Sequence, residues 1–532
     1  MLEKILPEYS AEVFSDNGKL DISGNCDVVL SAAYEDGRLA LDLKADSTPV
    51  RFIRLTWKFS PSPDTLYVGD AWERTYGDLQ WRTMDASRLF PWYVLMKTGH
   101  TLTAAGVKTG AAAFALWCVS PHCLTLWLDV RCGSQGVLLQ GRTLRVATIV
   151  FGDYEEATLM ASARAFCRDL AHTAPLPPPF PIYGANNWYY AYGNSSKESL
   201  IRDAAYISRL TEGLENRPFM VIDDGWETSD ERGGRTPDEK YEGVSWRSGN
   251  YRHGDMGEVA AGMRAQGCHA GIWWRPLLNT TDELGPECRL SREKHLLDPS
   301  RPEVLAVLQE DIRQFAKWGF ELVKHDFSTY DMFGKWAFEM RPWPADKDGG
   351  WAFADTSRTS AEIISDFYKA LHEADEKMII LGCNTIGHLG VGLIHQSRTG
   401  DDTSGWHWER TRKMGVNTLA FRIMQHRIFF EADADCAGVT PHIPWRLNAE
   451  WIRLVAESGT PLFVSIQPGL LSPEQEKQVK DALAIASRQT NTAEPAEDNW
   501  LWDCTPENWL INGKQEHFTL HDPLGGGNLE FI

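Results

Sequence analysis

The sequence has no stretch of apolar residues long enough to cross a bilayer, and residues 1–7 lack the extended apolar segment of a secretory signal. We therefore expect a cytoplasmic protein without membrane contact. The ten cysteines agree with this expectation, because they form no Cys-x-x-Cys pair and no spacing typical of zinc ligands. Reduced thiols are the norm in the cytoplasm, and we predict no metal site.

Positive charge is also scarce. The chain has 53 Lys and Arg against 73 Asp and Glu, which gives a formal net charge of -20. This excess of negative charge repels phosphate groups and argues against nucleic acid and anionic membrane surfaces as partners. Tryptophan, by contrast, is abundant at 22 residues. Its flat face can stack on a sugar ring or build a core, and composition does not separate the two.

A proline-rich segment divides the 532 residues, with five prolines among residues 175–181. We predict a stiff linker there. Residues 1–174 contain alternating apolar runs, such as 52–58 and 124–130, followed by a helix-like stretch at 155–171, and are predicted to form an antiparallel β-sandwich domain. Residues 69–82 break this pattern with charged and aromatic side chains, which indicates either a functional loop or a solvated hairpin.

After the linker, short apolar runs alternate with amphipathic helical stretches. Such alternation predicts a parallel sheet, and eight units of this length predict a (β/α)8, or TIM, barrel over residues 182–490. The link between Cys383 and Leu393 is too short for a full helix and is expected to be a loop. Residues 491–532 read as a small C-terminal β domain, so the chain is predicted to be multidomain. The expected strands are residues 182–186, 219–223, 269–274, 322–326, 378–383, 393–398, 428–433 and 461–465.

The run at 322–327 carries Lys324 and Asp326 two residues apart. On a strand these side chains point to the same face, and a carboxylate at the C-terminal end of a barrel strand lies at the mouth of the barrel. A helix-capping role for Asp326 is the alternative, but other strand ends show the same bias. They carry Asn186, Asn187, Asp223, Asp224, Trp274, Arg275, Cys383, Asn384, Arg398, Asp401, Asp402, Asp433 and Asp435.

Paired carboxylates in a polar, tryptophan-lined mouth indicate glycoside hydrolysis. One carboxylate attacks the anomeric carbon and the other protonates the leaving oxygen. Adjacent acids such as Asp223 and Asp224 can accept hydrogen bonds from sugar hydroxyls. Lys324 and Arg398 can donate to sugar oxygens and keep neighbouring carboxylates ionised.

Four segments resemble motifs of the α-galactosidases of glycoside hydrolase families 36 and 27. Their order and spacing match the family barrel, and the resemblance covers about residues 180 to 490. The segments are Val-Ile-Asp-Asp-Gly-Trp at 221–226, Lys-His-Asp at 324–326, Ser-Arg-Thr-Gly-Asp-Asp-Thr-Ser at 397–404 and Glu-Ala-Asp-Ala-Asp-Cys at 431–436.

The resemblance implies a retaining enzyme without metal or organic cofactor. Asp326 takes the position of the nucleophile and Asp402 that of the acid/base, with Asp401 as the rival one residue closer to Arg398. A retaining mechanism requires the two carboxyl groups to lie about 5–5.5 Å apart. The positions implied for sugar binding or for the border of the pocket are Asp223, Asp224, Trp188, Trp274, Lys324, Cys383, Asn384, Arg398 and Asp433.

Departures from the family pattern occur at His325, at residues 384–388, and at Glu431 and Ala434. They border the expected sugar pocket. We therefore expect the substrate to carry either galactose or a close relative of galactose. The predicted function is hydrolysis of terminal α-linked galactose, or such a relative, from a small oligosaccharide or glycoside. The alternatives are an α-galactosyl transglycosylase of the raffinose-synthase kind and a non-catalytic carbohydrate-binding relative.

Overall fold

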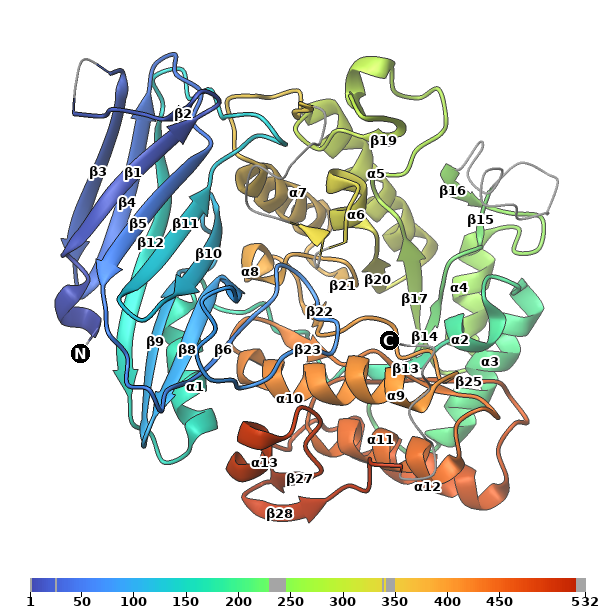
Figure 1. Cartoon of the computed structure of the whole chain (residues 1–532). Coiled ribbons are helices and arrows are strands. Elements are labelled where there is room, and N and C mark those ends of the chain that lie inside the picture. The colour runs from blue at the N-terminus through green and yellow to red at the C-terminus, as the bar shows by residue number, and fades with distance from the viewer. Residues whose placement is uncertain (1, 24–25, 229–244, 337–338, 341–349, 523–532) are drawn as a thin grey trace.

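The computed structural model describes residues 2–23, 26–228, 245–336, 339–340 and 350–522. Two six-stranded antiparallel sheets form its N-terminal part, the blue and cyan region of Figure 1. The first has the order β2-β1-β5-β11-β10-β7 and the second β3-β4-β12-β9-β8-β6. The strands are β1 (Tyr9–Ser15), β2 (Gly18–Lys19), β3 (Val28–Glu35), β4 (Arg38–Ala45), β5 (Phe52–Lys58), β6 (Leu66–Gly69), β7 (Leu89–Pro91), β8 (Tyr93–Thr98), β9 (Thr101–Val107), β10 (Phe114–Val119), β11 (Cys123–Asp129) and β12 (Thr143–Tyr154).

Alternation of apolar residues decides which face of each sheet is buried. In β11, Leu124, Leu126 and Leu128 are fully buried while the residues between them are partly exposed, as expected for a strand with one face against a core. Aromatic rings connect the two sheets. The ring centroids of Trp57 in β5 and Phe151 in β12 lie 5.1 Å apart. The antiparallel sheets predicted for this part of the chain are therefore confirmed.

The second half of the chain forms a nine-stranded parallel sheet in the order β23-β22-β21-β20-β17-β14-β13-β25-β24. Its outermost strands, β23 and β24, are separated by only Ala434 and Asp435, so the sheet curls until both edges belong to one segment of chain. The parallel sheet is confirmed, whereas the complete (β/α)8 barrel stays a prediction. The strands are β13 (Tyr183–Asn186), β14 (Phe219–Ile222), β17 (His269–Trp274), β20 (Leu322–His325), β21 (Ile379–Gly382), β22 (Gln396–Arg398), β23 (Glu431–Asp433), β24 (Cys436–Val439) and β25 (Leu462–Ile466).

Helices alternate with most of these strands, and their ends follow sequence signals. Ser196, Thr359 and Ser472 form capping boxes at the starts of α3, α7 and α12. Between β21 and β22 there is only the four-residue α8, where a loop was expected. The helices are α1 (Leu159–Leu170), α2 (Trp188–Ala191), α3 (Lys197–Leu210), α4 (Met256–Ala265), α5 (Pro302–Trp318), α6 (Ser328–Phe333), α7 (Ser360–Ala374), α8 (Gly387–Gly390), α9 (Trp408–Thr411), α10 (Thr418–Arg422), α11 (Trp445–Glu457), α12 (Pro473–Ala486) and α13 (Glu497–Trp502).

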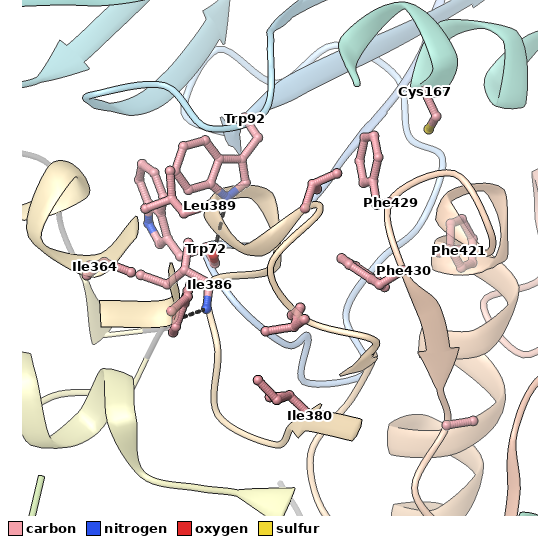
Figure 2. Packing of buried hydrophobic residues seen from close by; sticks show 14 of the residues in the cluster. Trp72, Trp92, Cys167, Ile364, Ile380, Ile386, Leu389, Phe421, Phe429 and Phe430 are labelled. Atoms are coloured by element: carbon pink, nitrogen blue, oxygen red, sulfur yellow. Dashed lines mark hydrogen bonds between the residues drawn. The ribbon is translucent and has the colours of Figure 1, made fainter. Parts of the chain in front are cut away.

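A continuous apolar core joins the N-terminal sheets to the parallel sheet. Trp72 and Trp92 come from the N-terminal part, and Figure 2 shows them beside Ile386 and Leu389 from the segment around α8. The Trp92 ring stacks on His388 with 4.5 Å between centroids and 11° between planes. The two parts of the chain are therefore held together by buried surface, not by a linker alone.

Smaller elements complete the fold. β15 (Glu227–Thr228) pairs with β16 (Ser245–Gly249), and β18 (Arg289–Leu290) with β19 (Glu293–Leu297). A three-stranded antiparallel sheet of β26 (Ala493–Pro495), β27 (Asn508–Ile511) and β28 (Lys514–His517) follows the parallel sheet. A separate C-terminal domain stays a prediction, as do the exact domain boundaries, and residues 523–532 lie outside the described residues. Within the described ranges, no helix is long and apolar enough to cross a membrane.

Candidate active site

A pocket of about 580 Å³ lies where several strands of the parallel sheet end. Carboxyl ends of parallel strands meet at one edge of the sheet, which is where side chains from different strands can converge. The N-terminal part of the chain also contributes, through residues 74 and 76. The lining residues are Arg74, Tyr76, Trp188, Asp223, Asp224, Trp273, Lys324, Asp326, Phe327, Trp336, Asp401, Asp402, Arg410 and Met414.

Asp326 follows β20 directly and lines the pocket together with Lys324, in agreement with their two-residue spacing. The backbone N–H of Phe327 donates to Asp326 Oδ1 at 2.7 Å. The indole Nε1–H of Trp273 donates to Oδ2 at 3.3 Å. Each oxygen of Asp326 therefore accepts one hydrogen bond, and the two bonds fix the orientation of the carboxylate.

Lys324 forms an ion pair with Asp223 at the end of β14, with Nζ 2.7 Å from Oδ2. Burial works against the charged amine, but the carboxylate of Asp223 outweighs it and raises the pKa of Lys324 well above its ordinary value. Asn186 Nδ2 donates to the same oxygen of Asp223 at 2.7 Å, and the backbone N–H of Asp224 donates to Oδ1 at 2.9 Å. This network fixes a cation and a carboxylate in the pocket wall.

The two candidate acid/base residues differ in their surroundings. Asp401 is held between two arginines, with Oδ1 2.9 Å from Arg74 Nη2 and Oδ2 2.6 Å from Arg410 Nη2. Asp402 accepts one longer bond, 3.3 Å from Arg398 Nη2, and its side chain is 40% exposed. Burial acts to raise the pKa of Asp402, but Arg398, followed by other nearby cations, lowers it overall. Asp402 is therefore the carboxylate with an oxygen available to a ligand.

Arg398, Cys383, Asn384 and Asp433 lie behind the pocket lining. The buried guanidinium of Arg398 contacts Cys383 Sγ at 3.2 Å and Asp435 Oδ2 at 3.0 Å, as well as Asp402. Burial raises the pKa of the Cys383 thiol, and it raises the pKa of Asp433 to about 6. The structure thus places these residues as supports of the lining. No group of three or more His, Cys, Asp or Glu among the described residues is arranged to hold a metal ion.

Of the two tryptophans expected at the pocket, Trp188 and Trp274, the structure confirms one position and corrects the other. Trp188 lines the pocket, as expected, but the tryptophan contributed by β17 is Trp273 and not Trp274. Trp274 is fully buried and packs edge-on against Phe315 of α5, with 5.5 Å between centroids. Successive side chains of a strand point to opposite faces, so the prediction named the residue on the wrong face.

The loop at 69–82 reaches the pocket from the N-terminal sheets, which favours the functional interpretation of this segment. It leaves β6 and extends toward β22 and β23 (Figure 1). Thr75 pairs with Gly400, and its N–H donates to Thr399 O at 2.9 Å. This pairing places the Arg74 guanidinium against Asp401 and 5.2 Å from the centroid of the Trp336 ring. Arg74 and Tyr76 were not predicted as site residues, and a functional role for their loop was one of two interpretations left open by the sequence.

Other lining residues were not predicted at all. They share no sequence motif. Trp273 lies within β17, Phe327 comes two residues after the end of β20, and the other three lie in segments between strands. The nearest signal in the sequence for any of them is the cluster of charged residues after Asp402, which includes Arg410 on α9. The residues are Trp273, Phe327, Trp336, Arg410 and Met414.

Glu73 is buried behind Arg74, where it accepts hydrogen bonds from Asn384 Nδ2 at 2.5 Å and the Tyr76 hydroxyl at 3.1 Å. Burial raises its pKa to about 7 despite the charge of Arg74. The fold therefore favours the neutral carboxyl, so stability from Glu73 is complete below its ordinary pKa of 4.5 and is lost as the pH rises toward 7.

We predict that Glu73→Gln, which cannot ionise, removes this pH dependence. Relative to wild type, the variant should gain stability between pH 4.5 and 8, by at most about 3 kcal/mol. Urea unfolding of both proteins across this range checks the prediction. If the free energies of unfolding of wild type and Glu73→Gln differ by the same amount at every pH, the pKa of Glu73 does not change on folding.

Comparison with solved structures identifies the fold. An α-galactosidase from Thermus thermophilus in complex with p-nitrophenyl α-D-galactopyranoside matches with a TM-score of 0.58 at 14% sequence identity, over 93% of this chain and 100% of the other. A GH36 α-galactosidase from Geobacillus stearothermophilus matches with a TM-score of 0.59 at 14% identity, over 94% and 79% of the two chains. An α-galactosidase from Lactobacillus brevis gives 0.58 at 13% identity, over 94% and 76%. No family model and no curated protein matches the sequence. The chain has the fold of the GH36 α-galactosidases.

Proposed function

We propose that this protein is a retaining exo-α-glycosidase that removes terminal α-linked galactose, or a closely related sugar, from small oligosaccharides or glycosides. One observation carries the proposal: Asp326 and Asp402, on separate strand ends, line one pocket together with the Lys324–Asp223 pair. Two carboxyl groups facing one sugar are the minimum requirement for glycoside hydrolysis by double displacement.

In the proposed first step, Asp326 attacks the anomeric carbon and forms a glycosyl ester. Asp402 gives its proton to the leaving oxygen, and in the second step it takes a proton from the attacking water. Burial opposes ionisation of Asp402, but Arg398 outweighs it and favours the ionised form. A bound sugar excludes water from Asp402, which raises its pKa and prepares it to act as the acid.

Recognition of the sugar falls to the polar lining. Asp223 and Asp224 can accept hydrogen bonds from hydroxyl groups, and Lys324 can donate one. Trp188 and Trp273 supply flat apolar surfaces. Arg74 and Tyr76 add a wall from the N-terminal loop to the pocket, and such a wall suits the removal of a terminal sugar better than cleavage within a long chain.

The test is hydrolysis of aryl α-galactoside, α-N-acetylgalactosaminide, α-glucoside and β-L-arabinopyranoside by wild type and by Asp326→Ala. Turnover of one substrate, lost in the variant, is the expected result. Proton NMR of the first product should show the α anomer, and a β anomer would reject retention. Transfer of the sugar to added oligosaccharide in preference to water would identify a transglycosylase. Binding without turnover would identify a carbohydrate-binding protein.

A further inference from the structure

We propose that an aromatic platform beside the pocket binds the sugars of the leaving group, so that oligosaccharides are hydrolysed in preference to simple glycosides. The platform consists of Tyr192, Trp406 and His442. This inference rests on the proposed function, because a leaving group exists only if the pocket cleaves a glycosidic bond.

The platform presents large rings to solvent. Trp406 is 44% exposed and Tyr192 is 40% exposed. A soluble protein rarely leaves adjacent large aromatic side chains uncovered unless they contact a ligand or partner. The rings lie together, since Trp406 Nε1 donates to the Tyr192 hydroxyl at 2.6 Å and the Trp406 ring stacks on His442 at 4.2 Å and 28°.

The backbone holds these rings in fixed positions. Tyr192 has a φ of 46°, in the left-handed region that bulky residues rarely adopt. Ser404 and Gly405, which lead into Trp406, have φ values of 27° and 75°. Gly405 packs so closely on Gly438 that a Cβ at position 405 would lie 2.2 Å from the Gly438 oxygen. Unfavourable backbone conformations of this kind persist where the surrounding structure fixes them, often at ligand sites.

The platform is continuous with the pocket on the side of Asp402. Trp188, which lines the pocket, lies 5.3 Å from Tyr192 between ring centroids. Trp406 follows Asp402 by four residues. Burial raises the pKa of Tyr192, and the nearby carboxylate of Asp402 adds to this effect. Because the acid/base protonates the leaving oxygen, the leaving group must lie on this same side.

The chemistry of the platform fits a pyranose. One face of a pyranose ring is made mainly of C–H groups, which lose contact with water when they cover an aromatic ring. Hydroxyl groups at the edge of the sugar remain free for hydrogen bonds or for solvent. A platform of two exposed rings can therefore hold sugar units beyond the scissile bond without demanding one hydroxyl pattern.

Two substrates with the same donor sugar distinguish the contribution of the platform to kcat/KM from that of the pocket. Galactosyl fluoride has a leaving group too small to reach the platform, whereas stachyose carries several sugars beyond the scissile bond. The experiment compares kcat/KM for both substrates in wild type, Trp406→Ala and Trp406→Phe. Trp502→Ala serves as the matched control, because Trp502 is 71% exposed and lies outside the pocket lining.

We expect Trp406→Ala to lower the ratio of kcat/KM for stachyose to kcat/KM for the fluoride about tenfold, as for loss of one apolar ring contact. Trp406→Phe should recover most of this ratio, and Trp502→Ala should not change it. If wild type hydrolyses the fluoride but Trp406→Ala leaves the ratio unchanged, the platform is not a sugar site. If wild type hydrolyses neither substrate, the proposed function fails for galactose, and with it the platform as a site for the leaving group of galactosides.

Discussion

Asp326→Asn is expected to lower kcat for an aryl α-galactoside by about 10⁴-fold or more, because the amide cannot form the glycosyl ester. The side chain keeps its shape and can still accept the hydrogen bond from the Phe327 N–H. Folding should therefore survive. Steady-state kinetics and thermal unfolding, measured on the same preparation, check both parts of the prediction.

Two controls make this result specific. Asp203→Asn changes a buried acid on α3, outside the pocket lining, and should not reproduce the loss. Azide added to Asp326→Ala should restore turnover and give the β-glycosyl azide, because the small anion can attack from the space that the carboxylate leaves. A variant that keeps more than about a tenth of the wild-type kcat would remove Asp326 from the role of nucleophile.

Asp402→Asn is expected to have an effect that depends on the leaving group. For an oligosaccharide, whose leaving oxygen needs a proton, kcat/KM should fall about 10² to 10⁴-fold. Galactosyl fluoride releases a fluoride ion, which does not need to be protonated. For this substrate the fall in kcat/KM should therefore be much smaller. The pH profile for the oligosaccharide should also lose its alkaline limb, since that limb reports deprotonation of the acid.

Asp401→Asn is the matched comparison, because it makes the same change one residue away. Its carboxylate is shared by Arg74 and Arg410. We expect the variant to weaken substrate binding similarly for both leaving groups, since it releases two arginines that line the pocket. If the loss of kcat/KM depends on the leaving group in Asp401→Asn and not in Asp402→Asn, then Asp401 and not Asp402 is the acid/base.

The strand ends could be predicted because parallel strands are short, buried and apolar, and because polar residues that follow them share one edge of the sheet. Lys324, Asp326 and the Asp223–Asp224 pair were found in this way and line the pocket. The error at Trp274 has a simple cause. Two adjacent tryptophans end β17, and only the register of the strand decides which of them faces the pocket.

Other features depend on contacts that sequence spacing does not reveal. The seventh predicted strand, 428–433, is in the structure the shorter β23, and β24 follows it after a break at Asp435 with a φ of 73°. Arg74 belongs to a loop of the N-terminal sheets, and its partner Asp401 lies more than three hundred residues further along the chain. Side-chain periodicity carries no information about such a contact.

The pairing of Thr75 with the end of β22 makes completion of the pocket a late event in folding. The hydrogen bonds from Thr75 to Thr399 join residues 324 positions apart. Contacts of such high sequence separation form slowly, because the chain between them must first lose its freedom. During synthesis, the loop is made long before the strand end on which it rests. Recovery of hydrolysis after dilution from denaturant should therefore lag behind recovery of secondary structure.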